Sequence, residues 1–193
     1  MQWFINPYGV SLAFIPRSGS TAFARALLNQ YYPELLPLLI NCSFPPGRTE
    51  VAPQFICPSV GTPGTNDIAI ALIRDPIERF KSGFSRAANG RSVQQVIDDL
   101  INKTEKVVNI HIAKQNDRIK YVNNNILLYK FPYAIEAVAN ELGLIQVPPQ
   151  ENESPDGDKP ELTQDQINQL LVYYSEDMTL FNQAYMDYNK NTI

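Results

Sequence analysis

The sequence predicts one α/β domain with a mainly parallel sheet flanked by helices. The chain has 193 residues, which suits a single compact domain. Short apolar runs bounded by turn residues alternate with segments of helical periodicity. One run, Ile68–Ile73, has six apolar residues in succession, as a strand covered on both faces requires. We therefore expect residues 1–193 to form one domain in which helices connect parallel strands.

The elements are expected in strand–helix order. A strand from Val10 to Ile15 precedes a helix that Ser20 caps and that ends near Tyr31. After the strand at 68–73, Asp75 caps a helix with Pro76 at its first position. The later predicted elements are a helix from the Ser92 cap to Asn102, a strand at 126–131, a helix at 132–142 ended by Gly143, and a helical region from the capping box of Thr163 and Gln166 to Tyr185.

Composition limits the function classes. The net charge is −4 and the sequence pI is near 5.0, which argues against non-specific nucleic-acid binding. Cys42 and Cys57 match no zinc spacing, and the sequence contains a single histidine, so we expect no metal site. Free thiols are favoured, although a Cys42–Cys57 disulfide stays open. The N-terminus lacks a signal peptide and no apolar run is long enough to span a bilayer, so we expect a cytoplasmic protein without a membrane partner.

Two motifs suggest an anion site. The first lies between the first strand and its helix, at Arg17-Ser18-Gly19-Ser20-Thr21. A helix N-terminus presents unpaired N–H groups and a favourable dipole, and the loop adds a guanidinium and three hydroxyls. We expect Gly19 to let the backbone approach a phosphate closely. A plain strand–helix turn with a serine cap is the alternative. The loop is not a Walker A sequence, because it has one glycine and no following lysine.

The second motif follows the strand at 68–73. Arg74 stands at the carboxyl end of this strand, where open α/β sheets bind ligands. On the following helix, Ile77, Phe80 and Phe84 share one face, which we expect to pack on the sheet. Arg79, Ser82 and Arg86 share another face, which would offer two guanidinium groups and a hydroxyl. A solvated basic face is the alternative for this helix.

Together and in this order, the two motifs resemble those of the PAPS-dependent sulfotransferases (PAPS is 3'-phosphoadenosine 5'-phosphosulfate). The loop Pro16–Thr21 resembles the family's 5'-phosphosulfate loop, and the segment from Arg74 to Ser82 matches its R-D-P-x-x-R-x-x-S motif for the 3'-phosphate. The resemblance implies a P-loop-like three-layer α/β fold and PAPS as co-substrate, with PAP as product. It places Arg17, Ser18, Gly19, Ser20, Thr21, Arg74 and Ser82 at the nucleotide.

Later segments are similar to the carbohydrate branch of that family. His111 to Gln115 resembles its H-x-x-P-Q, with Lys114 in place of proline. Asn152-Glu153-Ser154 resembles an N-x-S loop, and the segment from Tyr174 to Phe181 matches Y-x-x-D-x-x-L-F. We interpret Tyr174 and Asp177 as structural. The Golgi members carry a membrane anchor, which we do not expect in this protein.

The implied reaction is an in-line displacement at sulfur by an acceptor oxygen, without a metal. Arg17 is expected to stabilise the charge that develops on the leaving oxygen. His111 is the first candidate for the base that takes the acceptor proton, because it is the sequence's one imidazole. A packed histidine is the alternative for it, and Glu50 is the second candidate base.

The acceptor has no recognisable signature. We expect a carbohydrate hydroxyl first, and a peptide tyrosine or a small metabolite behind it. Two other functions stay open: a non-catalytic module that binds PAP or phosphate, and, ranked lower, a P-loop nucleotide kinase, which would need ATP, Mg²⁺ and an acid to hold the metal. The oligomeric state has no signature in the sequence.

Overall fold

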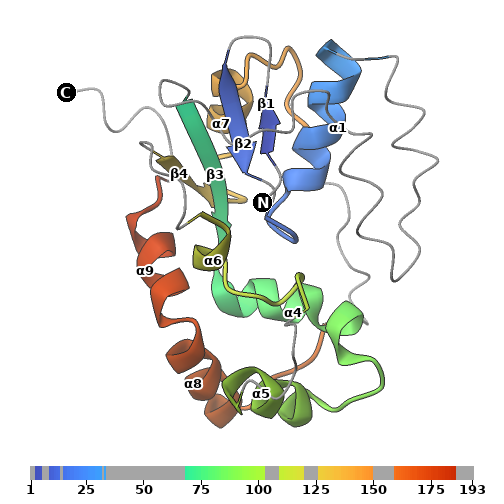
Figure 1. Ribbon diagram of the computed structural model, residues 1–193, viewed down its shortest axis with the longest axis vertical. Helices are drawn as coiled ribbons and strands as arrows, with labels where there is room; N and C mark the ends of the chain where they lie inside the picture. The colour runs from blue at the N-terminus through green and yellow to red at the C-terminus, as the bar shows by residue number, and fades with distance from the viewer. Residues whose placement is uncertain are drawn as a thin grey trace.

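The computed structural model describes residues 3–5, 9–13, 15–31, 33, 68–102, 109–119, 126–149 and 159–185. Within these ranges the chain forms an α/β structure, drawn in Figure 1. The expected strands and helices are present. Two elements were not predicted: the strand β1 (Trp3–Ile5) and the short helix α6 (Asn116–Ile119). No helix in the described ranges combines the length and apolar character needed to cross a bilayer.

The sheet has the strand order β1-β2-β3-β4. Strands β2 (Val10–Ala13), β3 (Ile68–Arg74) and β4 (Ile126–Phe131) run parallel, and β1 pairs antiparallel with β2. The predicted parallel sheet is therefore confirmed. Strand β3 lies in the middle, with Leu12 beside Ile70 on one side and Phe131 beside Arg74 on the other. The carboxyl ends of β2, β3 and β4 therefore open on the same edge of the sheet.

Apolar side chains alternate between the two faces of the sheet. One face packs on helices α1 (Ser20–Tyr31) and α7 (Ile135–Glu141), and Leu12, Ile70 and Phe23 are buried there. The other face packs on α6 and on α9 (Ser175–Gln183), with Ile73 and Ile119 in its core. Helices thus cover both faces, which explains why the run at 68–73 is apolar throughout.

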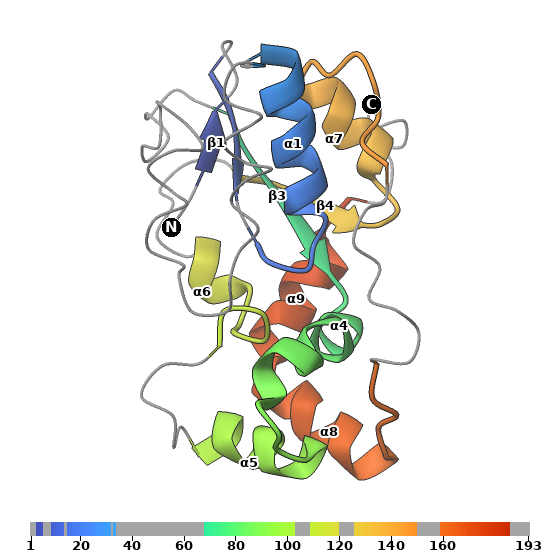
Figure 2. The ribbon, with the colours of Figure 1, turned by 90° about the vertical axis from the view of Figure 1, so that its right-hand side faces the viewer.

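A separate group of helices continues the molecule beyond the carboxyl end of the sheet. Helices α4 (Pro76–Ala88), α5 (Val93–Asn102) and α8 (Gln164–Tyr173) form this group. Figure 2 shows α5 and α8 at the end of the molecule opposite to α1 and α7. Phe80 lies in a buried cluster with residues of α5 and α8, and Ile77 and Phe84 pack against it. The expectation that this stripe of α4 packs on the sheet is therefore wrong, because α5 and α8 cover it instead.

The helix starts depend on local hydrogen bonds. Asp75 Oδ1 accepts from the N–H groups of Ile77 and Glu78, as the predicted cap of α4 requires. The capping box of Thr163 and Gln166 is present at α8. Ser20 differs from the prediction: its hydroxyl donates to Ile15 O at 2.7 Å, and Gly19 O accepts from Ala22 and Phe23 instead. Ser20 is therefore the first residue of α1 and not its cap.

Two further boundaries differ from the sequence prediction. Helix α7 begins at Ile135 instead of 132, because residues 132–134 form a turn. Its predicted end is confirmed: Gly143 has φ 66°, and Leu144 N donates back to Ala139 O. The predicted C-terminal helical region is two helices, α8 and α9, which meet at the buried Tyr174.

Candidate anion-binding site

The loop between β2 and α1 presents the N-terminus of α1 at the carboxyl edge of the sheet. The carbonyl of Gly19 accepts from the N–H groups of Ala22 and Phe23. No residue in the described part of the chain accepts from the N–H groups of Gly19, Ser20 and Thr21, which have no intrahelical partner at a helix start. Three successive backbone donors with the positive end of the helix dipole form an arrangement that favours an anion.

The serine hydroxyls of this loop point into the protein. Ser18 is fully buried, and its hydroxyl donates to Gln115 Oε1 at 3.3 Å. Ser20 is also buried and donates to Ile15 O. Since both hydroxyl protons are used internally, these serines fix the shape of the loop. Thr21 is half-buried on the first turn of α1. The donors of the loop are therefore mainly backbone N–H groups.

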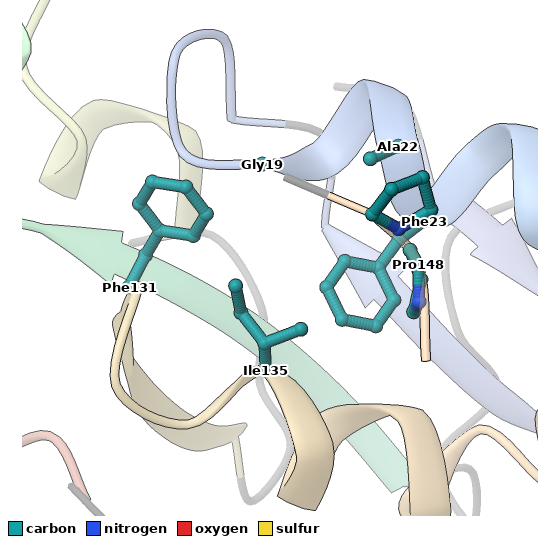
Figure 3. A pocket seen from close by; sticks show the side chains of 7 residues that line it. Gly19, Ala22, Phe23, Phe131, Ile135 and Pro148 are labelled. Carbon is teal, nitrogen blue, oxygen red and sulfur yellow. The ribbon is translucent and has the colours of Figure 1, made fainter. Parts of the chain in front are cut away.

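The ring of Phe131 leaves no room for a side chain at position 19, which is therefore a glycine. A Cβ at Gly19 would lie 2.5 Å from Phe131 Cε2, and its φ of 77° is in the left-handed region. Figure 3 shows the Phe131 ring directed at Gly19. The ring contact is a reason for the glycine that the sequence did not predict, and the expected close approach of a phosphate stays a prediction. An apolar pocket beside this contact is lined by Gly19, Ala22, Phe23, Phe131, Ile135, Pro148 and Pro149 (Figure 3).

Arg74 stands where the sequence places it, at the carboxyl end of β3. Its Nη1 donates to Arg17 O at 3.1 Å, and its guanidinium carbon Cζ lies over the Phe131 ring, 5.6 Å from the ring centroid. The side chain is half-buried. Phe131 therefore supports both the loop glycine and Arg74. The sequence analysis did not name Phe131 as a site residue. It could have done so, because two neighbouring parallel strands that end at 73 and 131 place Phe131 beside Arg74.

Arg17 connects the loop to α4. Its Nε donates to Ser82 O at 2.7 Å, and Nη2 donates to the same oxygen. Burial, followed by the positive charges of Arg86 and Arg74, lowers the pKa of Arg17 from its ordinary value. The guanidinium groups of Arg86 and Arg74 are thus near enough to that of Arg17 to repel it. The structure brings together Arg17, Arg74 and Ser82, three residues that the sequence assigned to one nucleotide.

Arg79 has a different environment from the other motif arginines. Only 1% of it is exposed, and it donates to three backbone carbonyls. These are Pro16 O at 3.0 Å, Ala113 O at 2.6 Å and Ile110 O at 3.1 Å. Burial lowers the pKa of Arg79 to about 10, which leaves it protonated at neutral pH. The expectation that Arg79 offers its guanidinium on an open face is therefore wrong, because Arg79 clamps the start of the loop to residues 110–113.

The segment 109–116 is held between α4 and α9. Tyr174 Oη donates to Ile112 O, and the Asp177 carboxylate accepts from the backbone N–H groups of Gln115 and Asn116 at 2.7 and 2.9 Å. Burial raises the pKa of both Tyr174 and Asp177. The interpretation of these two residues as structural is confirmed by their contacts.

His111 belongs to this segment. It is half-buried, and its buried Nδ1 atom has no hydrogen-bond partner among the residues that the structure describes. Burial, followed by the charges of Arg17, Arg86 and Arg79, lowers the pKa of His111 to about 4. The imidazole is therefore neutral at pH 7 and can accept a proton. A Cβ at Gly83 would lie 2.5 Å from His111 O, so α4 packs directly on the backbone here.

Other predicted residues lie outside the described part of the chain. These are Glu50, Cys42, Cys57 and the Asn152-Glu153-Ser154 loop. Among the residues that the structure describes, no three His, Cys, Asp or Glu side chains gather closely enough to hold a metal ion. The chain matches no protein-family model, no curated protein and no solved structure.

Proposed function

We propose that this protein is a sulfotransferase with a P-loop-like three-layer fold, which transfers a sulfuryl group from PAPS to a hydroxyl acceptor. The observation that carries the proposal is the meeting of two motifs at one sheet edge. Arg74 donates to the carbonyl of Arg17, 57 residues away, and Arg17 donates to the carbonyl of Ser82. A nucleotide with phosphate groups at both its 5' and 3' positions needs two such anion sites side by side.

Each motif has a distinct task in this proposal. The N–H groups at the start of α1 hold the 5'-phosphosulfate, because they are donors without a described acceptor. Arg74 and Ser82 hold the 3'-phosphate and thereby favour PAPS over ATP, which lacks that group. Ser18, Gly19 and Ser20 keep the loop in shape, and Thr21 offers its hydroxyl from the first helical turn.

The transfer step is an in-line displacement. The acceptor oxygen forms a bond to sulfur while the bond from sulfur to the 5'-phosphate oxygen breaks, and PAP leaves with that electron pair. Arg17 stabilises the charge that grows on the leaving oxygen, since its guanidinium is held beside the loop by Ser82 O. The acceptor proton passes to a base, for which His111 is the first candidate and Glu50 the second.

The lowered pKa of His111 affects how well it can act as the base. A base with a pKa near 4 is weak at neutral pH. An anionic nucleotide beside Arg17 and Arg86 offsets the positive charges that lower this pKa, so nucleotide binding makes His111 a stronger base. We expect His111→Ala to lower kcat by about 10²–10⁴-fold. Normal turnover in that variant, together with loss of turnover in Glu50→Gln, assigns the base to Glu50.

Calorimetry with PAP and with AMP tests the proposal. The wild-type protein should bind PAP more tightly than AMP, and Arg74→Ala should lose about 1.5–3 kcal/mol of PAP binding. Arg91→Ala is a matched control, because Arg91 pairs with Asp99 at 2.7 Å beside α5, away from the loop. Equal affinity for PAP and AMP contradicts the assignment of Arg74 and Ser82.

Turnover separates an enzyme from a binding module. A panel of sugars, phenols and peptides incubated with radiolabelled PAPS should yield at least one sulfated product, with carbohydrates as the first class expected. Tight PAP binding without any transfer would instead favour a non-catalytic module.

A further inference from the structure

Gln115 is a fully buried polar residue with no part in the transfer step. Its relative exposure is 0%, and its side-chain amide makes three hydrogen bonds. Nε2 donates to Arg74 O at 2.8 Å, while Oε1 accepts from Arg74 N at 3.0 Å and from the Ser18 hydroxyl at 3.3 Å. One amide therefore touches both anion-binding segments.

The position of this amide follows from the sheet. Strand β2 ends at Ala13, while β3 continues to Arg74. The backbone N–H and C=O of Arg74 bond to the side-chain amide of Gln115. A side-chain amide has the same donor and acceptor as a peptide unit, so Gln115 completes the hydrogen bonding of β3 at the point where β2 becomes the loop.

The backbone of Gln115 is itself fixed from the other side. Its N–H donates to Asp177 Oδ2 at 2.7 Å, and Asp177 is fully buried at the start of α9. Arg79 also holds Ala113 O, two residues before Gln115. The amide is thus attached to a rigid support, and little freedom remains in the separation of Ser18 from Arg74.

We propose that Gln115 is a positioning residue that sets the distance between the phosphate loop and the Arg74 site, and so makes the protein selective for a nucleotide phosphorylated at both its 5' and 3' positions. The inference rests on the proposed function. Two linked phosphates gain affinity over one only where both sites are at the correct separation, since the second contact is then intramolecular. Loss of the Gln115 bonds leaves each site present but lets their separation vary.

Calorimetry with PAP, AMP and 3'-AMP tests the role of Gln115. In Gln115→Met, which keeps the side-chain length but removes all three bonds, the preference for PAP over AMP should fall by about 10–100-fold, because part of the gain of about 10²–10⁴-fold from two linked contacts is lost. Affinities for AMP and 3'-AMP should change little, because each occupies one site. Gln115→Glu, which loses the donor to Arg74 O, should also lower the preference for PAP over AMP. This variant replaces Gln115→Met in the test if the methionine variant does not fold.

Gln166→Met is the matched control. Gln166 is the capping-box residue of α8, so its loss lowers stability without touching the loop or β3. Its preference for PAP should equal that of the wild type. A folded Gln115 variant that retains the full preference for PAP overturns the positioning role and leaves the proposed function intact. A wild-type protein that binds PAP and AMP equally overturns both proposals.

Discussion

Two neighbouring regions of this molecule use arginine in opposite ways. The rim, defined by Arg17, Arg74, Arg86 and His111 at the carboxyl edge of the sheet, holds half-buried or exposed side chains. Burial and the neighbouring arginine charges lower the pKa of Arg17 and of His111 there. The junction, defined by Arg79, Gln115, Tyr174 and Asp177, is buried and rich in bonds to backbone. Arg74 and Arg79 are five residues apart in one motif, yet one belongs to each region.

This difference shows that a match to a motif does not tell which of its residues can contact a ligand and which support the fold. A rim arginine remains within reach of solvent, so an anion can reach it and is attracted by the accumulated positive charge. A junction arginine is desolvated, and its donors are taken up by three carbonyls, so it has no capacity for a ligand. The rim and the junction should therefore respond to substitution in different observables.

The largest effect is expected at Arg79. Arg79→Met leaves the carbonyls of Pro16, Ile110 and Ala113 without their donor, and unsatisfied buried groups cost about 1–3 kcal/mol each. We expect the free energy of unfolding, measured by urea denaturation, to fall by roughly 3 kcal/mol or more. Arg74→Met is the paired variant, with an expected change of about 1 kcal/mol or less. Equal losses in the two variants would remove the distinction between junction and rim.

Arg17 provides the strongest test of the rim. Arg17→Ala should lower kcat of sulfuryl transfer by about 10²–10³-fold, the effect of removing one donor to a developing negative charge. PAP affinity should change less than the rate, because the charge on the leaving oxygen grows in the transition state. Single-turnover kinetics with radiolabelled PAPS measures both quantities. Weakened PAP binding with an unchanged kcat would instead assign Arg17 to ground-state binding.

Gly83 tests how tightly the junction is packed. Alanine normally stabilises a helix interior relative to glycine by about 0.5–1 kcal/mol. Here the new Cβ would lie 2.5 Å from His111 O, so Gly83→Ala should instead destabilise the protein by about 1–3 kcal/mol, as overpacking does. Thermal denaturation measures the change. Ser85→Ala, at an exposed position of the same helix, is the control and should be close to neutral.

The smallest effect concerns the charge state of His111. Its pKa is lowered from 6.5 to about 4 in the folded protein, so the folded state binds this proton less tightly than the unfolded state. The resulting contribution to stability is present above pH 6.5 and is lost as the pH falls toward 4. His111→Gln should therefore show a shallower loss of stability over this range than the wild type. Parallel pH profiles would show that neither burial nor the rim cations lower the pKa of His111.

PAP should reduce this pH effect. Bound phosphate groups offset the charges of Arg17 and Arg86, and the pKa of His111 should rise. An NMR titration of the imidazole with and without PAP measures the shift directly. A pKa that stays unchanged with PAP bound would place the nucleotide away from His111.

The sequence by itself determined the α/β class, the three parallel strands and the caps at Asp75 and Thr163, because these depend on local apolar patterning and on short-range hydrogen bonds. It also selected Arg17, Arg74 and Ser82, which the structure brings together at one edge of the sheet.

Only the tertiary structure decided which polar residues stay accessible to a ligand and which are buried and support the fold. Nothing local distinguishes Arg79 from Arg74, and the difference arises because residues 110–113 fold over one and not the other. The ring of Phe131 against Gly19 and the amide of Gln115 at the end of β3 likewise join segments more than 40 residues apart. Such contacts depend on how α4, α9 and the sheet pack together, and packing between distant segments leaves no periodic signal in the sequence.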